Sequence, residues 1–252
     1  MKRPWEALRV AKSVLDSFRD LRDEEGLAIA LKLATRVHVE ISETGENGGA
    51  AHRKSALEAA DEACTLFRKQ GDAREEASML MAISNIHLSR QEFEDAYIFA
   101  EGFMNLSTKQ GDMRGEALGF QQRAKIMLME RKEPDEIVFP AKKSVHIFKE
   151  LGDWLGEIDA QQVLASAYQR DGLTSMALES MMRALALSQE FKDKHCQRQR
   201  IGEVLDVVMS MFALEDAKDT IIEEQELARE GGDLRRELVG CQRLPRVYVQ
   251  MQ

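Results

Sequence analysis

The sequence lacks most of the features that accompany secretion or membrane insertion. It has only three cysteines, Cys64, Cys196 and Cys241, in 252 residues. Their odd number and wide spacing are typical of reduced thiols rather than of a disulfide framework. No apolar run approaches the ~20 residues of a membrane span, and charged residues interrupt the N-terminal segment where a signal peptide needs an apolar core. We therefore expect a soluble intracellular protein, with the cytoplasm as the default compartment; an organelle is the alternative if the chain is a trimmed form.

Positive charge is also in short supply. Lysine and arginine together number 35 against 44 aspartates and glutamates, which gives a net charge of −9 and an isoelectric point near 5.2. A nucleic-acid scaffold should carry a basic face, and a basic patch is what attracts a protein to anionic membranes. The glycine-rich stretch 45–49 has neither the lysine nor the preceding strand of a phosphate-binding loop. We expect no nucleic-acid partner, no membrane insertion and no cofactor.

Catalytic groupings are missing as well. The five histidines are far apart in the sequence and form no histidine, cysteine and aspartate cluster at metal-ligand spacing: they are His38, His52, His87, His146 and His195. His195 is followed by Cys196, but neighbouring residues of a helix point in different directions, so a nucleophile and base pair is not expected there. The sequence predicts no catalytic residue and no metal, and we interpret the chain as a protein that is not an enzyme.

Helix-forming residues are abundant, and the chain repeats itself. It holds four prolines and many alanines, leucines, glutamates and arginines. A short Gly-Asp junction recurs at intervals of roughly 40 residues, a period typical of stacked helical hairpins. The copies are Gly71-Asp72, Gly111-Asp112, Gly152-Asp153 and Gly232-Asp233, and Asp23 fits if extra residues precede the next copy. Glycine suits the left-handed end of one helix and aspartate the cap of the next.

The repeat predicts an all-α, right-handed α-solenoid of about five helix-turn-helix repeats, with half-repeats at both ends. We expect one domain, 1–252. Its predicted units are a half-repeat at 4–19, repeats at about 24–69, 73–109, 113–149, 154–190 and 195–230, and a partial repeat at 234–252. Pro140 falls inside a helical segment, so that helix either is kinked or begins near Pro140.

The fourth unit resembles the tetratricopeptide repeat. Small and aliphatic residues stand at the consensus packing positions of that family: Leu164, Ala165, Tyr168, Ala177, Met181 and Ala184. The longer period and the Gly-Asp junction resemble the subclass that includes Pins-type G-protein-signalling modulators, kinesin light chains and related bacterial regulators. The resemblance covers essentially the whole chain and implies a fold rather than an activity, since the matched positions are packing positions. No G-protein regulatory motif accompanies it.

The repeat register predicts which side chains face the concave side of the stack. First helices of such repeats line a groove that binds extended or helical peptides. The candidate binding residues mix amides, cations and methionine, which suits amide hydrogen bonds to a peptide backbone and a few charge contacts. They are Lys32, Arg36, Met81, Asn85, Gln121, Lys125, Gln162, Ser166, Gln169 and Arg170. The alternative is that these are ordinary solvated helix residues.

The sequence is therefore typical of a non-catalytic protein–protein interaction scaffold or adaptor that binds a partner peptide or helix in its concave groove. It fits a subunit of a larger assembly, with end-to-end packing against another subunit or a second copy. The alternative is a regulatory repeat module that senses a peptide and changes superhelical pitch. An enzyme of the helical-repeat type and an RNA-binding repeat protein are weaker alternatives.

Overall fold

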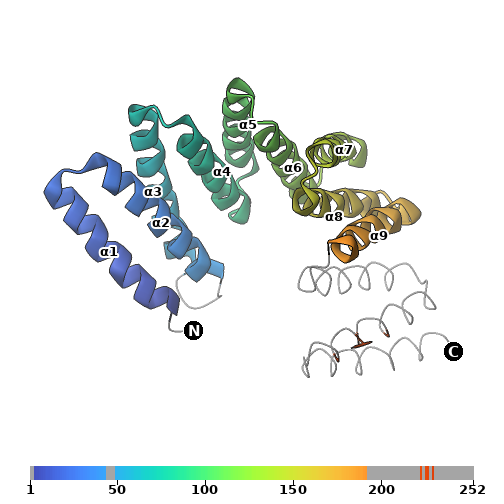
Figure 1. The fold of residues 1–252 in the computed structure, drawn as a ribbon, viewed down its shortest axis with the longest axis horizontal. Helices are drawn as coiled ribbons and strands as arrows, with labels where there is room; N and C mark the ends of the chain where they lie inside the picture. Colours follow the sequence, from blue (N-terminus) through green and yellow to red (C-terminus); the bar gives the residue numbers. More distant parts are fainter. Residues whose placement is uncertain (1–2, 44–48, 192–221, 223–224, 227–228, 230–252) are drawn as a thin grey trace. The chain divides into compact units, whose positions relative to one another are not determined.

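The computed structural model describes residues 3–43 and 49–191, together with the single positions 222, 225, 226 and 229. Within these residues the chain forms nine α-helices and no strand (Figure 1). The helices are α1 (Arg3–Leu21), α2 (Glu24–Glu43), α3 (Gly49–Gln70), α4 (Ala73–Ser89), α5 (Phe93–Gln110), α6 (Met113–Glu130), α7 (Pro134–Leu151), α8 (Trp154–Arg170) and α9 (Thr174–Glu190). The predicted all-α helical-repeat class is confirmed.

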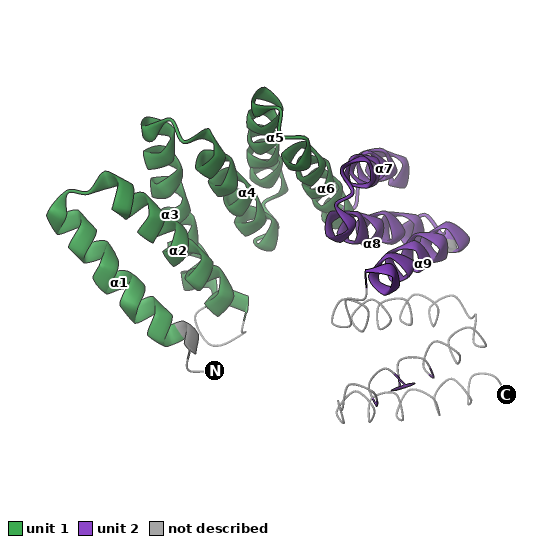
Figure 2. Cartoon of the chain, in the orientation of Figure 1, with its two compact units in different colours: residues 1–130 green, residues 131–252 purple. Residues whose placement is uncertain are grey.

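The chain divides into two compact units, residues 1–130 and residues 131–252 (Figure 2). Among the described helices, α1–α6 belong to the first unit and α7–α9 to the second. Within each unit the main contacts join helices that follow one another in the chain, as expected of a helical repeat. That all of 1–252 forms one domain stays a prediction, and the expected units at 195–230 and 234–252 lie outside the described residues.

The Gly-Asp junctions adopt the geometry expected of them. Gly111 and Gly152 end α5 and α7 with φ of 68° and 65°, in the left-handed region that a residue with a side chain rarely adopts. The aspartate that follows each glycine then accepts a hydrogen bond from a backbone N–H in the first turn of the next helix. Asp112 Oδ1 accepts from Gly115 N at 2.9 Å, and Asp153 Oδ1 accepts from Gly156 N at 3.0 Å.

A second glycine, three residues after the aspartate, lets the new helix approach the previous one. A Cβ atom on Gly156 would overlap the ring of Phe148, a side chain that is fully buried. A Cβ atom on Gly115 would overlap the side chain of Ser107 in the same way. The spacing Asp-x-x-Gly therefore sets both the start of the helix and its distance from the preceding helix.

Small residues occupy many of the buried positions of each unit, as the resemblance to the tetratricopeptide repeat implies. In the first unit the fully buried positions include Ala28, Ala56, Ala60 and Ala63. In the second unit the consensus positions are buried too: Ala165 is 2 %, Ala177 0 % and Tyr168 5 % exposed. Alanine at a helix crossing lets two backbones approach closely, and the larger neighbours fill the space beside the crossing.

Pro140 lies inside α7 instead of at its start. The helix begins at Pro134, which occupies the first turn, and continues through Pro140 to Leu151. Of the two alternatives left open by the sequence, a helix that starts near Pro140 is therefore excluded. The next helix begins with Trp154, whose ring stacks on Phe191 at the end of α9 with ring centroids 4.9 Å apart.

Replacing Gly156 with alanine tests the close approach at the junction. We expect Gly156→Ala to destabilise the protein by about 1–3 kcal/mol, because the added methyl group overlaps the buried Phe148 ring. The matched control is Gly102→Ala in the interior of α5, where a Cβ atom would lie 3.6 Å from Leu80 in ordinary contact. That change should stabilise by about 0.5–1 kcal/mol. Urea unfolding of the two variants measures both effects, and a Gly156→Ala protein as stable as the parent contradicts the account of the junction.

Candidate functional site

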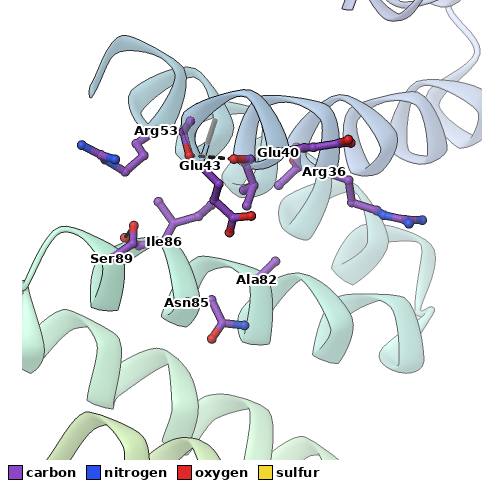
Figure 3. A pocket seen from close by; sticks show the side chains of 11 residues that line it. Arg36, Glu40, Glu43, Arg53, Ala82, Asn85, Ile86 and Ser89 are labelled. Carbon is purple, nitrogen blue, oxygen red and sulfur yellow. Dashed lines mark hydrogen bonds between the residues drawn. The ribbon is translucent and has the colours of Figure 1, made fainter. Parts of the chain in front are cut away.

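A groove of about 480 Å³ lies between α2 and α4, the first helices of two consecutive repeats (Figure 3). We call it the α2–α4 groove. It is lined by Thr35, Arg36, Val39, Glu40, Ser42 and Glu43 of α2, by Arg53 of α3, and by Ala82, Asn85, Ile86 and Ser89 of α4. All of these residues belong to the first compact unit.

The helical repeat explains why these side chains share a surface. On α4, the lining positions 82, 85, 86 and 89 follow the three- and four-residue spacing that places side chains on one face of a helix. The lining positions of α2 follow the same spacing. Because the two helices occupy equivalent places in neighbouring repeats, their corresponding faces form the two walls of the groove.

The walls combine apolar contact surface with charges that no other described residue neutralises. Val39, Ala82 and Ile86 supply the apolar part. Glu40, Glu43, Arg36 and Arg53 supply two charges of each sign, and none of the four forms an ion pair or hydrogen bond with another described residue. A ligand in the groove can therefore gain charge contacts without breaking any that the described chain already makes.

A buried polar network on the interior side of the groove wall fixes the orientation of the Asn85 side chain. Gln122 of α6 is 3 % exposed, and its Nε2 donates to Asn85 Oδ1 at 2.8 Å and to Ser84 Oγ at 3.1 Å. Ser84 Oγ in turn donates to the Ala96 carbonyl oxygen of α5 at 2.7 Å. The network joins α4, α5 and α6, and it uses the oxygen of the Asn85 amide. The amide NH₂ group of this exposed side chain is left as a donor at the groove wall.

Two of the six predicted binding residues of the first unit, Arg36 and Asn85, line the α2–α4 groove. Lys32 of α2 instead forms an ion pair with Glu75 of α4. Met81 is half-buried against the hydrophobic core. Gln121 is 5 % exposed, and its buried Nε2 has no hydrogen-bond partner among the described residues.

The remaining predicted residues do not line the α2–α4 groove. Lys125, the sixth of the first unit, is half-buried on α6. The other four lie on α8 in the second unit. There Gln169 and Arg170 are exposed, Gln162 is half-buried, and Ser166 Oγ donates to the Gln162 carbonyl oxygen at 3.0 Å.

The hollow of the second unit uses a different face of α8 from the predicted one. It has a volume of about 400 Å³, and none of the predicted binding residues lines it. Its lining residues are Lys142, Gln161, Leu164, Tyr168, Met176, Glu179, Ser180 and Arg183. Of the predicted concave row, Arg36 and Asn85 line the α2–α4 groove, and no member of the row lines the hollow beside Tyr168.

Sequence reasoning missed several residues of the α2–α4 groove. Glu40 and Glu43 lie one and two turns after Arg36, and Ser89 lies one turn after Asn85. Extending the predicted row by four residues along each first helix would have found Glu40 and Ser89. Gln122, which orients Asn85, carries no such signal, because only the packing of α6 on α5 shows that it reaches α4.

Two groups of histidines also become visible only in three dimensions. His87 of α4 lies against Glu92 in the turn before α5, with 2.7 Å between Nδ1 and Oε2. His38 of α2 lies against His52 of α3, with 2.9 Å between the two Nδ1 atoms, and the Trp5 ring packs edge-on against His52. Burial lowers the pKa of His38, and the nearby His52 and Lys12 lower it further. A hydrogen bond between two imidazoles requires one to accept, so at least one of the pair is neutral.

None of the described groups whose pKa is shifted lines the α2–α4 groove. Burial raises the pKa of the Cys64 thiol, which keeps it protonated and is the reverse of what activates a nucleophilic thiolate. Burial also raises the pKa of Asp61 and of Tyr97. Cys64 and Asp61 lie near each other on α3, Tyr97 lies on α5, and none of the three lines the α2–α4 groove. No described helix is both long and apolar enough to cross a membrane.

Comparison with known proteins defines the fold. No family model matches the chain, and no curated protein matches its sequence. Solved structures do match. BtubC (BKLC) from P. vanneervenii is 16 % identical, with 99 % of this chain and 92 % of that chain covered and a TM-score of 0.61. A Rap protein complexed with Competence and Sporulation Factor is 15 % identical, with 96 % of this chain and 69 % of that chain covered and a TM-score of 0.65.

A third similar structure names the repeat type. It is a Signal Transduction ATPase with Numerous Domains (STAND) protein with a tetratricopeptide repeat sensor, from Pyrococcus horikoshii. It is 15 % identical with a TM-score of 0.63, and the match covers 92 % of this chain but 36 % of that one. The fold of this chain is that of the tetratricopeptide-like helical repeat proteins. Its similarity to one subclass of them stays a prediction.

The histidine pair predicts how the stability of the first unit depends on pH. His38 has a lowered pKa in the folded chain, so the unfolded chain binds more protons below the ordinary value of about 6.5. The contribution of His38 to the free energy of unfolding is therefore highest above pH 6.5, and it decreases as the pH falls from there towards the pKa that His38 has in the folded chain. We expect the Tm to fall more between pH 7.5 and 5.5 in the parent than in His38→Asn. His146→Asn, at an exposed histidine of α7, should keep the parent's pH dependence; if it loses as much of that dependence as His38→Asn does, the pair is not the cause.

Proposed function

We propose that the chain is a non-catalytic protein–protein interaction scaffold, and that it binds an extended segment or a helix of a partner protein in the α2–α4 groove. The observation that carries this proposal is the composition of the groove walls. Apolar surface lies beside two carboxylates and two guanidinium groups that have no partner among the described residues. Concave grooves of this volume, in which polar side chains lie beside apolar surface, are a usual form of ligand-binding site.

Asn85 fits the recognition of a peptide backbone. Its NH₂ group can donate to a backbone carbonyl oxygen of a bound segment, while Gln122 keeps the amide from rotating. A donor that is already ordered loses little conformational entropy on binding. Arg36 and Arg53 suit acidic groups of a partner, and Glu40 and Glu43 suit its basic groups. Affinity then comes from the backbone contact and the apolar surface, and selectivity from the charges.

A non-catalytic role agrees with the chemistry of the described residues. The groups with a shifted pKa do not line the groove, and the shifts of Cys64 and Asp61 come first from burial. The groove itself holds no cysteine or histidine. Binding is the activity that its walls support.

Peptide selection tests the proposed site directly. A displayed library of random 12-residue peptides is selected against the full chain, and the enriched peptides are measured by fluorescence anisotropy. We expect Asn85→Ala and Arg36→Glu to weaken binding at least about 10-fold, because each removes or reverses a polar contact worth about 1.5 kcal/mol or more. The matched controls are Asn105→Ala on α5 and Arg74→Glu on α4, two exposed positions outside the groove.

Either of two results would overturn the groove as the binding site. In one, no peptide is enriched by the full chain. In the other, the two control substitutions weaken binding as much as the groove substitutions do.

The second candidate is a peptide-sensing regulatory module that changes superhelical pitch when its ligand binds. The division of the chain into two compact units favours it, because a repeat protein can respond to a ligand by rearranging compact parts. Of the proteins of similar fold, the Rap protein is described as complexed with Competence and Sporulation Factor. The STAND protein is described as having a tetratricopeptide repeat sensor. Both descriptions fit this second role.

Hydrogen exchange separates the two candidates. With a selected peptide bound, the scaffold predicts protection confined to α2, α3 and α4. The sensor predicts changed exchange in α7, α8 and α9 as well, far along the chain from the groove. Mass spectrometry of the free and peptide-bound chain measures the difference, with Asn85→Ala as the unbound control. A change limited to the first unit excludes the sensor.

A further inference from the structure

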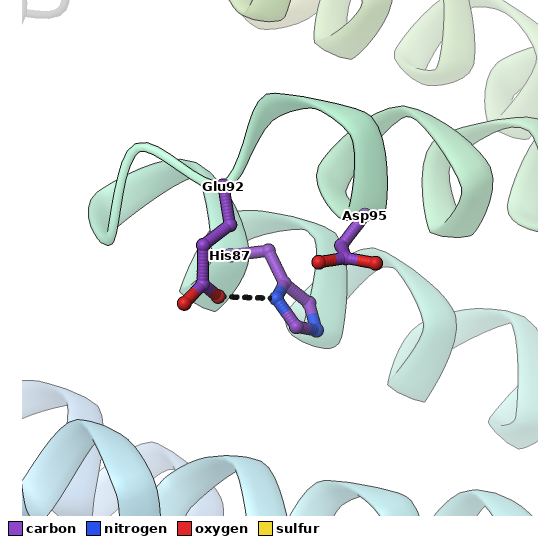
Figure 4. Close-up of side chains that lie close together, drawn as sticks. All are labelled: His87, Glu92 and Asp95. Atoms are coloured by element: carbon purple, nitrogen blue, oxygen red, sulfur yellow. Dashed lines mark hydrogen bonds and ion pairs between the residues drawn. The ribbon is translucent and has the colours of Figure 1, made fainter.

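A second polar cluster of the first unit lies at the turn between α4 and α5, away from the residues that line the α2–α4 groove. His87, at the end of α4, is flanked by Glu92 and Asp95, which belong to the turn and to the first turn of α5 (Figure 4). One nitrogen or oxygen atom from each of the three residues lies within 4.8 Å of the other two. Figure 4 shows the imidazole between the two carboxylates.

The local fold brings the three residues together and orients them. Gln91 has a positive φ of 62°, which reverses the chain after α4, and Glu92 N donates to the His87 carbonyl oxygen at 3.0 Å. The reversal places the Glu92 side chain beside the imidazole. The His87 ring stacks on Phe99 of α5, with centroids 5.3 Å apart and planes 7° from parallel, and its residue is only 9 % exposed. The imidazole is therefore held by packing.

Ordinary helix-capping roles account for part of this cluster only. Acidic residues at the start of a helix compensate its dipole, and the hydrogen bond from His87 to Glu92 joins two helix ends. However, the Glu92 side chain forms no capping hydrogen bond with α5. The Asp95 carboxylate forms no hydrogen bond or ion pair with any described residue. Both carboxylates thus keep acceptor capacity beside a fixed imidazole.

A further carboxylate and one cation complete the surroundings of His87. Asp61 of α3 lies near His87: burial raises the pKa of Asp61, and the nearby His87 opposes that rise. Arg90 Nη2 bonds Glu92 Oε1 at 2.8 Å, which neutralises one side of that carboxylate and leaves Oε2 directed at the ring. The site is therefore anionic overall, and one of its possible ligands, Asp95, is exposed and able to rotate.

We propose that His87, Glu92 and Asp95 bind one divalent transition-metal ion, with zinc as the probe. A ring nitrogen of His87 and one oxygen of each carboxylate supply three ligands, and water completes the coordination. Ligand atoms about 2.1 Å from one ion lie at most ~4.2 Å apart, so a rotation of the exposed Asp95 closes the site. If the ion binds the ring nitrogen that faces Glu92, the proton shared between those two groups is released. The bound ion ties the end of α4 to the start of α5.

Zinc titration of the full chain by calorimetry tests this site. Because cysteine and histidine side chains elsewhere in the chain are potential zinc ligands, the readout is the difference between matched variants. We expect Asp95→Asn to weaken one equivalent of zinc binding at least about 10-fold. Glu94→Gln, which removes the same charge from the neighbouring residue in the same turn of α5, should leave that equivalent unchanged. Asp95 is exposed and unbonded, so its substitution leaves the fold intact.

Thermal unfolding supplies an independent readout. Zinc at about 100-fold over its Kd should raise the Tm of the parent and of Glu94→Gln by about 5 °C or more. His87→Gln and Asp95→Asn should show a clearly smaller rise, because a 10-fold weaker Kd leaves about half of the stabilisation at the same zinc concentration. The proposal is overturned if Asp95→Asn binds zinc as the parent does, or if Glu94→Gln weakens binding equally. It is also overturned if calcium, which prefers oxygen ligands, binds as tightly and His87→Gln has no effect.

Discussion

The structure depends on how closely each helix can approach the one before it. At the start of a repeat an aspartate caps the new helix, and a glycine three residues later removes the side chain that would keep the two helices apart. The described examples are Gly26 against Phe18, Gly115 against Ser107 and Gly156 against Phe148. A cap of this type contributes about 1 kcal/mol, but the contact below it decides the spacing of the helices. The alanines of the core continue the same close approach along the helices.

One junction departs from this pattern, and the departure bears on the groove. After Asp72 the third residue is Glu75 rather than glycine, and Glu75 forms an ion pair with Lys32. The pair joins α4 to α2 beside the two walls of the groove. Lys32 therefore contributes to the packing of one repeat on the next, whereas Arg36, one turn further along α2, lines the groove with no partner among the described residues.

The polar side chain of Asn85 is hydrogen-bonded on the side that faces the protein interior, and its NH₂ group is available on the side that faces the groove. The Gln122 amide bonds the oxygen of Asn85 and the hydroxyl of Ser84, and thereby links three helices behind the wall. A buried network whose members are all bonded fixes a single arrangement. The charged residues in front of it remain solvated and unpaired among the described residues. A binding site for an extended chain needs side chains that are already ordered and charges that are available to the ligand. The buried hydrogen-bond network provides the order, and the charged residues of the groove walls provide the charges.

The period of the sequence was enough to predict the helices, because packing positions, caps and glycine ends all recur with it. A repeat at about 154–190 was predicted from the sequence, and the structure has the helices Trp154–Arg170 and Thr174–Glu190 in that stretch. The site was harder to predict. The repeat register is enough to place Arg36 and Asn85. On α6 the register favoured Gln121, but Gln121 is buried and its neighbour Gln122 donates the hydrogen bond to Asn85. Periodicity does not resolve a difference of one residue. The group around His87 depends on the chain reversal at Gln91, which side-chain spacing alone does not reveal.

The most direct test of the central claim is a crystal structure of the chain with a peptide selected against it. The account predicts electron density for the peptide between α2 and α4, with a peptide carbonyl oxygen within hydrogen-bond distance of Asn85 Nδ2. It also predicts that the bond from Gln122 to Asn85 is preserved. Peptide density on another face, with the α2–α4 groove filled only by water, would contradict the account.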